Sequence, residues 1–177
     1  MKHPALAGLG AGIALALFGV FAYQHLPSPG GSAAHDAVDH ARLWSIGLPG
    51  LDGRDLSLDH WRGKVLVVNF WAPWCGPCRA EMPGFDRLQQ QFGAQGLQFV
   101  GIALDAPDKV TAFLADHPVS YPVLQGAVGG QELARAAGNR LGGLPYTLIL
   151  DRRGTPVATL TGGLDEARLE RLVRPLL

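Results

Sequence analysis

One stretch of this chain constrains the fold more than any other, because a buried-strand pattern runs directly into a helix pattern. Residues 65–71 read VLVVNFW, a near-continuous apolar run that is typical of a strand buried on both faces of a sheet. Residues 76–92 follow with apolar side chains at helical spacing, and Gly93 ends the pattern. Pro83 lies inside this helix, and we expect it to kink the helix.

Strand and helix patterns alternate along the rest of the chain. We expect strands at 97–104, 146–151 and 157–160, and helices at 107–116, at 131–137 and from Asp165 onward. Upstream, residues 43–48 and 56–58 flank a turn-rich stretch and predict a short hairpin. Pro156 indicates that the last strand lies at a sheet edge. The order of elements predicts an α/β fold with a mixed, partly antiparallel sheet.

The first 23 residues have the pattern of a membrane segment. Residues 5–23 form a run of 19 without a charge, nearly enough to cross a bilayer core of about 30 Å as a helix. Lys2 precedes the run, so the positive-inside tendency keeps the N-terminus in the cytoplasm. The alternatives are a cleaved signal peptide, with Ser32-Ala33-Ala34 as its cleavage site, and a buried core helix. We expect residues 1–23 to anchor a periplasmic domain in the inner membrane.

Residues 24–42 are rich in Pro, Gly, Ser and Ala and lack clean periodicity, so we interpret them as a flexible tether. Three histidines lie there, but their irregular spacing favours a solvated linker over a metal site. The globular domain is then expected at 43–177. The formal net charge is zero, with 15 basic and 15 acidic residues and no basic block, which argues against a nucleic-acid partner.

The two cysteines of the chain lie where the strand meets the helix, in the sequence Cys75-Gly76-Pro77-Cys78. The first N–H groups of a helix lack backbone partners and carry partial positive charge, so a thiolate at Cys75 is stabilised and its pKa is lowered. Pro77 has no backbone N–H, but this loses no hydrogen bond, because N–H groups in the first turn of a helix have no intrahelical acceptor. Cys78 lies one turn further on, within reach of the first sulfur. We therefore assign Cys75 as nucleophile and Cys78 as resolving thiol.

Such a pair performs thiol–disulfide exchange without a cofactor, and the reverse sequence of steps oxidises a substrate. Four other interpretations remain open at this point. Half of a zinc site needs two more ligands, a structural disulfide would close only a tiny loop, a peroxidatic cysteine needs no partner so near, and soft thiolates suit Cu(I). No second CxxC and no local histidine pair is present, so we expect redox exchange and no bound metal.

The segment FWAPWCGPCRAEMP resembles the active-site segment of the thioredoxin superfamily. Together with Glu81, Pro83 and the later GLPYTLILD, it is most similar to the membrane-anchored, extracytoplasmic TlpA/ResA-like branch, which includes the cytochrome c maturation reductases. The resemblance covers residues 43–177 and the anchor-and-tether layout. It implies a thioredoxin-like mixed sheet flanked by helices, an N-terminal hairpin extension and a central insertion at about 106–130.

The resemblance also implies site residues. Pro145 matches the family's cis-proline, as opposed to a plain strand-start proline, and Leu144 before it implies backbone hydrogen bonds to a bound substrate. Pro83 matches the family's helix-kinking proline. Glu81 resembles a glutamate characteristic of the branch, which implies that it tunes the thiol pKa values and takes the proton from Cys78. The alternative for Glu81 is a solvated glutamate on the helix surface.

Asn69 departs from the cytoplasmic thioredoxins, which usually carry a buried aspartate six residues before the first cysteine. Because Asn69 cannot titrate, the departure favours Glu81 or water as the proton acceptor. Trp74 and Trp71 flank the cysteines and suit an apolar surface that faces the substrate, although Trp71 also suits core packing. Arg79 either favours the thiolate through its charge or lies exposed on the surface.

The resemblance finally implies partners: extracytoplasmic protein disulfides as substrates and a membrane electron donor of the DsbD/CcdA type. Apocytochrome c and copper-assembly proteins are the substrate candidates. The dedicated cytochrome reductases have a Pro-Glu pattern at the cis-proline, whereas here Tyr146 follows Pro145. This difference weakens apocytochrome c as a substrate candidate. The alternative functions are a net disulfide oxidase or isomerase with the same chemistry, and a copper or haem-pathway thiol-binding module.

Overall fold

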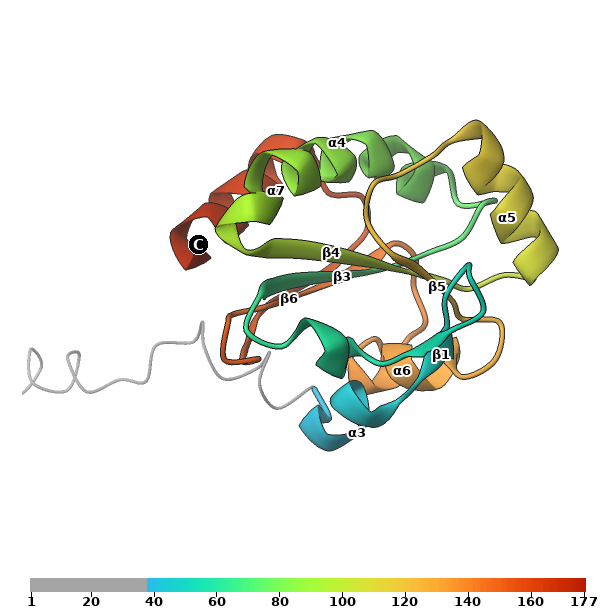
Figure 1. Cartoon of the computed structure of the whole chain (residues 1–177), viewed down its shortest axis with the longest axis horizontal. Helices are drawn as coiled ribbons and strands as arrows, with labels where there is room; N and C mark the ends of the chain where they lie inside the picture. Colours follow the sequence, from blue (N-terminus) through green and yellow to red (C-terminus); the bar gives the residue numbers. More distant parts are fainter. Residues whose placement is uncertain (1–37) are drawn as a thin grey trace, which may run out of the picture. The chain divides into compact units, whose positions relative to one another are not determined.

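The computed structural model describes residues 38–177 (Figure 1). The expected anchor at 1–23 and most of the expected tether at 24–42 lie outside the described residues. Within residues 38–177, no helix is both long enough and apolar enough to span a membrane.

A five-stranded mixed sheet forms the centre of the described domain, in the order β5-β4-β3-β6-β7. Its strands are β3 (Val65–Trp71), β4 (Leu97–Ala103), β5 (Val123–Gln125), β6 (Tyr146–Leu150) and β7 (Pro156–Thr161). Strands β3, β4 and β5 are parallel to one another. Strand β6 pairs antiparallel with β3, and β7 pairs antiparallel with β6. The expected mixed α/β sheet is therefore confirmed, with β7 at the edge that Pro156 predicts.

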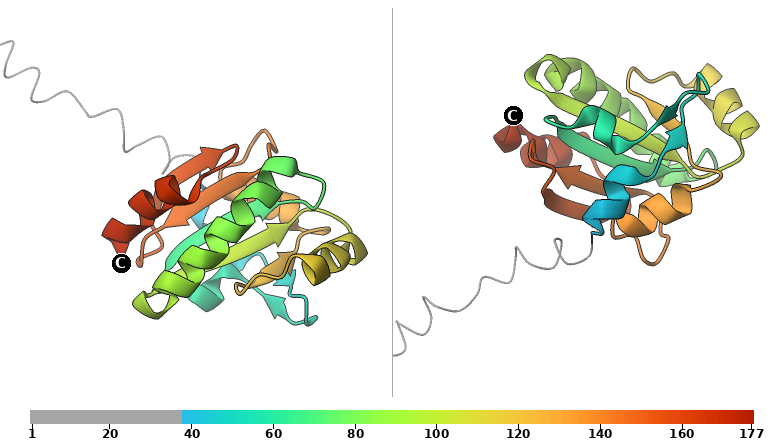
Figure 2. Two further views of the ribbon diagram at one scale, coloured as in Figure 1. Left: turned by 90° about the horizontal axis from the view of Figure 1, so that it is seen from above. Right: turned by 60° about the horizontal axis from the view of Figure 1, so that its bottom comes forward.

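Helices cover both faces of this sheet (Figure 1). They are α3 (His40–Ser45), α4 (Gly76–Phe92), α5 (Pro107–Asp116), α6 (Gly130–Ala136) and α7 (Glu166–Val173), with short 3-10 turns at Leu58–Trp61, Gly93–Gln95 and Arg174–Leu176. Helices α4, α5 and α7 lie on one face, and α3 and α6 lie on the other. Seen from above, α4 and α7 lie side by side over the strands (Figure 2).

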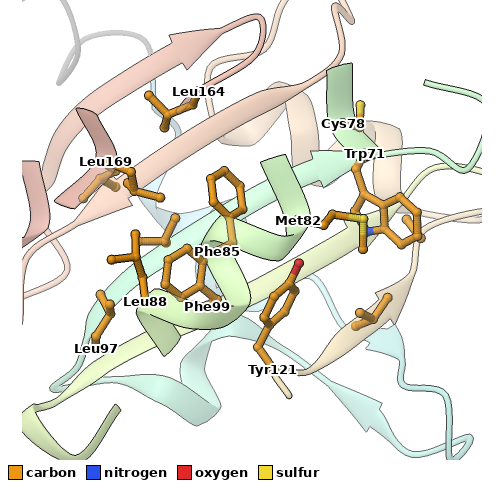
Figure 3. Packing of buried hydrophobic residues seen from close by; sticks show 14 of the residues in the cluster. Trp71, Cys78, Met82, Phe85, Leu88, Leu97, Phe99, Tyr121, Leu164 and Leu169 are labelled. Atoms are coloured by element: carbon orange, nitrogen blue, oxygen red, sulfur yellow. The ribbon is translucent and has the colours of Figure 1, made fainter. Parts of the chain in front are cut away.

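Two hydrophobic cores fill the space between the helices and the sheet, because successive side chains of β3 point to opposite faces. Val67 belongs to the core under α4 and α7, and Val68 belongs to the core over α6. In the first core, Phe85 of α4 stacks on Phe99 of β4 with ring centroids 5.4 Å apart (Figure 3). All seven residues of β3 are buried, as the apolar run at 65–71 predicts.

The N-terminal part of the domain differs from the expectation of a strand at 43–48. Residues 40–45 instead form α3, whose first turn is capped by the Asp39 carboxylate accepting from the N–H of Arg42 at 3.1 Å. Leu43 of this helix is fully buried, and Val38 is buried as well, so the packed domain begins inside the segment assigned to the tether. A shorter hairpin remains, formed by β1 (Leu48–Pro49) and β2 (Asp55–Leu56).

The segment at about 106–130 was expected to be an insertion. It contains α5, which the sequence analysis predicted, and the strand β5, which it did not. Strand β5 extends the sheet beyond β4, with Val123 opposite Gly101. Gly50 of the hairpin forms a bridge with Leu124 of β5, so the N-terminal extension lies beside this strand. The segment therefore supplies an edge strand of the sheet and a helix that lies on one of its faces.

Candidate active site

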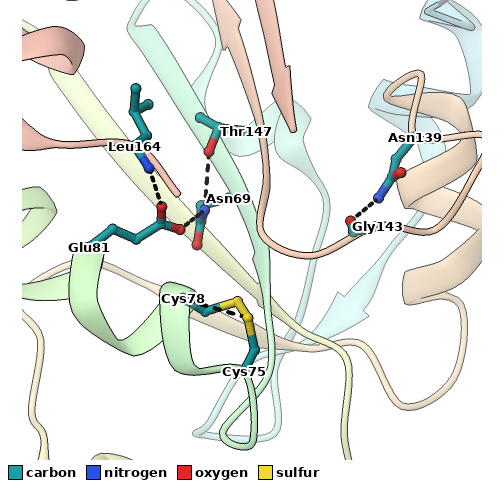
Figure 4. The surroundings of a disulfide bond; sticks show 8 residues. All are labelled: Asn69, Cys75, Cys78, Glu81, Asn139, Gly143, Thr147 and Leu164. Atoms are coloured by element: carbon teal, nitrogen blue, oxygen red, sulfur yellow. Dashed lines mark hydrogen bonds between the residues drawn. A yellow bond between two sulfur atoms is a disulfide. The ribbon is translucent and has the colours of Figure 1, made fainter. Parts of the chain in front are cut away.

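The two cysteines lie at the point where the central strand β3 ends and helix α4 begins. Cys75 is the N-cap of α4, and its Sγ accepts a hydrogen bond from the N–H of Cys78 at 3.3 Å. The two residues form a disulfide in this structure (Figure 4). Cys75 is 5% exposed to solvent and Cys78 is 0% exposed. An N–H group at the start of a helix that points at this sulfur is the arrangement that stabilises a thiolate.

Glu81 lies one turn after Cys78 on α4 and is buried, with 6% of its surface exposed. Its Oε1 accepts from Nδ2 of Asn69 at 2.8 Å, and its Oε2 accepts from the N–H of Leu164 at 3.0 Å (Figure 4). Burial raises the pKa of Glu81 to about 7, and the two hydrogen bonds oppose that rise. The alternative of a solvated surface glutamate is therefore wrong.

Asn69 lies in the middle of β3 and is buried. Its Nδ2 also donates to Oγ1 of Thr147 at 3.1 Å, because Asn69 and Thr147 are directly paired between β3 and β6. The sequence analysis missed both Thr147 and Leu164. Thr147 could have been suspected from the sequence, because it is a threonine inside the otherwise apolar strand pattern YTLIL. The role of Leu164 could not, because its backbone N–H makes the contact and every residue except proline has one.

The cis-proline segment lies at the same end of the sheet as the cysteines. The Leu144–Pro145 peptide bond is cis, as the resemblance implied, and Tyr146 just after it pairs with Phe70 of β3. Side-chain hydrogen bonds hold the residues before Pro145: Nδ2 of Asn139 donates to the carbonyl of Gly143 at 2.9 Å. The hydroxyl of Tyr146 donates to the carbonyl of Ala137 at 2.9 Å. These anchors were not predicted from the sequence.

The two tryptophans beside the cysteines have different surroundings. Trp74 is 68% exposed next to Cys75, whereas Trp71 is 1% exposed and packs against Phe113 with ring centroids 5.4 Å apart. The structure thus places Trp71 in the core and leaves Trp74 accessible to a partner. Arg79 is exposed on the first turns of α4, and the helix continues through Pro83.

The sequence analysis expected no bound metal, and that expectation stays a prediction. Across residues 38–177, no cluster of three or more His, Cys, Asp and Glu side chains has the arrangement of a metal site.

A disulfide at a helix N-terminus and a cis-proline at the same end of a five-stranded mixed sheet define the class: this is a thioredoxin-like thiol–disulfide oxidoreductase. Residues 41–158 match the model of the AhpC/TSA family. The chain belongs to that family. The expected thioredoxin-like fold and oxidoreductase class are confirmed.

Named relatives agree with this class. The chain is 35% identical over 116 residues to the thiol:disulfide interchange protein HelX of Rhodobacter capsulatus, covering 65% of this chain but only 62% of HelX. It is 30% identical to the thiol-disulfide oxidoreductase ResA of Halalkalibacterium halodurans, covering 72% of this chain and 73% of ResA. The solved structure of a thioredoxin-family thiol:disulfide interchange protein from Chlorobium tepidum TLS is 30% identical with a TM-score of 0.64, covering 74% of this chain and 92% of that one.

Proposed function

We propose that this chain reduces disulfide bonds of extracytoplasmic partner proteins by dithiol exchange at Cys75 and Cys78. The observation that carries the proposal is the position of the Cys75 sulfur at the N-cap of α4, 3.3 Å from the N–H of Cys78. Helix N-termini stabilise negative charge, so this position favours the thiolate that exchange requires.

The exchange proceeds in two steps that together move two electrons. The Cys75 thiolate attacks one sulfur of the partner disulfide, forming a mixed disulfide and releasing the other partner sulfur as a thiolate. Cys78 then loses its proton and attacks Cys75, which closes the Cys75–Cys78 disulfide and releases the second partner sulfur. Only sulfur atoms change oxidation state, so we propose that no cofactor takes part.

Glu81 is our proposed acceptor of the Cys78 proton. It is three residues from Cys78 on the same helix, so that the two side chains lie on neighbouring positions of one face. Its pKa, raised to about 7 by burial, is matched to a group that gains and loses a proton near neutral pH. An exposed glutamate with an ordinary pKa would stay ionised there and accept a proton poorly.

The partner protein is proposed to bind at the exposed end of the site. Trp74 offers an accessible aromatic surface beside Cys75. Leu144 and Pro145 lie at the same end of the sheet, where the Leu144 backbone is proposed to hydrogen-bond an extended partner segment. Gly76, Pro77 and Pro83 shape the helix that carries the cysteines.

The location and the electron source are further parts of the proposal. The uncharged run at 5–23, preceded by Lys2, supports an inner-membrane anchor with the catalytic domain in the periplasm. A domain there needs electrons from across the membrane, and we propose a donor of the DsbD/CcdA type. Apocytochrome c and copper-assembly proteins are the proposed substrates, because both need reduced cysteines.

Trapping of the mixed disulfide tests this function in the full chain. With insulin as the disulfide substrate, Cys78→Ser should accumulate a covalent complex on non-reducing electrophoresis, because the resolving sulfur is gone. Cys75→Ser, the matched control, should form no complex and reduce no insulin. Retention of insulin reduction by both variants would exclude exchange through this pair.

A further inference from the structure

A single amide nitrogen links the buried acid of the site to the strand that follows the cis-proline. Nδ2 of Asn69 donates to Oε1 of Glu81 at 2.8 Å and to Oγ1 of Thr147 at 3.1 Å (Figure 4). Each bond uses one of the two hydrogens of this NH₂ group. All three side chains are buried, so each lost hydrogen bond has a free-energy cost.

The hydrogen bonds of this arrangement favour the charged form of Glu81, in opposition to the effect of burial. Both carboxylate oxygens accept hydrogen bonds, one from Asn69 and one from the backbone N–H of Leu164. When Glu81 gains a proton, the new O–H group needs an acceptor, and both of its present side-chain and backbone partners are donors. The backbone N–H of Leu164 is always a hydrogen-bond donor and cannot become an acceptor. The Asn69 side chain can, because a half-turn about its last bond puts the amide oxygen where the nitrogen was.

We propose that Asn69 and Thr147 form a two-position switch that holds Glu81 in both its charged and its neutral form. In the charged form, the Asn69 NH₂ group donates to Glu81 and to the Thr147 hydroxyl. In the neutral form, the turned amide oxygen accepts from the protonated Glu81 and from the same hydroxyl, which both donates and accepts. Asn69 and Thr147 are then positioning residues for the proton transfer, and the inference rests on the proposed role of Glu81.

The switch moves no proton of its own. A proton passes from the Cys78 thiol to Glu81 and later leaves to solvent, while Asn69 and Thr147 only exchange donor and acceptor roles. Glu81 also lines a surface pocket of about 350 Å³ together with Ala80 and Asp165. The pocket lies between α4 and residues 163–165, which precede α7, and we propose that the proton leaves Glu81 on this side.

The other titratable groups around Glu81 leave its titration readable in the oxidised protein. Cys75 and Cys78 are joined in the disulfide and do not titrate. Burial raises the pKa of Tyr121, which faces Glu81 from the segment before β5, far above neutrality, so that its phenol stays uncharged. Asp165, at the start of α7, already accepts from the N–H of Arg168 at 2.8 Å.

Nuclear magnetic resonance of the oxidised full chain tests the switch directly. The ¹³C resonance of the Glu81 carboxyl and the ¹H and ¹⁵N resonances of the Asn69 side-chain amide would be followed as a function of pH. We expect both to change with one common midpoint near 7. A titration of Glu81 that leaves the Asn69 amide resonances unmoved would overturn the proposal.

A matched pair of variants adds a second readout. Thr147→Val keeps the side-chain shape but removes the hydroxyl. In the charged form, one N–H of Asn69 then has no acceptor. The neutral form is destabilised less, because the amide oxygen of Asn69 still accepts from Glu81. The Glu81 midpoint should rise by roughly 0.5 to 1 pH unit. Thr147→Ser should keep the wild-type midpoint. Equal midpoints in Thr147→Val and wild type would contradict the switch.

These readouts use the disulfide form and no substrate, so they separate the switch from the proposed function. Loss of insulin reduction in Cys75→Ser tests the function without involving Asn69 or Thr147. If exchange fails while the two titrations move together, the switch stands and the function falls. If exchange works while the Asn69 amide does not titrate, the switch falls and the function stands.

Discussion

Replacing Glu81 by glutamine should remove a pH-dependent loss of stability from the oxidised protein. Burial raises the pKa of this carboxyl from its ordinary value of 4.5 to about 7. Below pH 4.5 the group is neutral in both the folded and the unfolded chain, and it has no effect on their balance. Between the two values only the unfolded chain ionises, so the free energy of unfolding falls as the pH rises.

The size of this loss follows from the gap between the two pKa values, about 2.5 pH units. At 1.36 kcal/mol per unit, the wild type should lose about 3 kcal/mol between pH 4.5 and 7 and no more above that range. Glu81→Gln is nearly isosteric and cannot ionise, so it should lack this slope.

Urea unfolding of the disulfide form at several pH values measures both curves. Subtracting the Glu81→Gln curve from the wild-type curve removes the contribution of every other titrating group that the two proteins share. We expect the difference to change by about 3 kcal/mol across the range, in favour of wild type at acid pH. Two parallel curves would refute the assignment of a raised pKa to this carboxyl.

Two further predictions concern the core and the partner surface. Phe85→Ala should lower the free energy of unfolding by about 3–5 kcal/mol, because Phe85 is fully buried and stacks on Phe99; urea unfolding measures this, with Phe85→Leu as a milder control. A loss under about 1 kcal/mol would contradict the packing described. Trp74→Ala should raise the KM for a protein disulfide by roughly fivefold or more, with little change in stability, because an exposed aromatic residue contributes to binding and little to the core. Unchanged KM values in steady-state assays would remove Trp74 from the partner surface.

The strongly patterned elements of the fold were predictable from the sequence. The apolar run at 65–71 is β3, and the helices at 76–92 and 107–116 have the expected bounds, since their periodicity and their Gly and Pro residues agree. Strand β5 was not predictable because three residues are too few to show a period. Helix α3 was missed because a single turn-and-a-half, capped by Asp39, carries only Leu43 as a buried residue.

The site was predictable where chemistry fixes the residue type and not where tertiary packing decides. The cysteine spacing and Pro145 were evident, and Asn69 was recognised as a departure from the usual aspartate. The contact between Asn69 and Glu81 joins residues from β3 and α4, and that to Thr147 depends on the β3–β6 register. No local pattern encodes that register, so the network that surrounds the acid emerges only in three dimensions.

The equilibrium reduction potential of the Cys75–Cys78 pair tests the central claim most directly. The full chain would be equilibrated in glutathione or dithiothreitol buffers, and the dithiol fraction would be read by alkylation. The account predicts a value at or below about −220 mV, on the glutaredoxin-to-thioredoxin side of the scale, as expected for a reductase supplied by a membrane donor. A value near −120 mV would contradict it and would make the protein a net oxidant that uses the same residues in the reverse order.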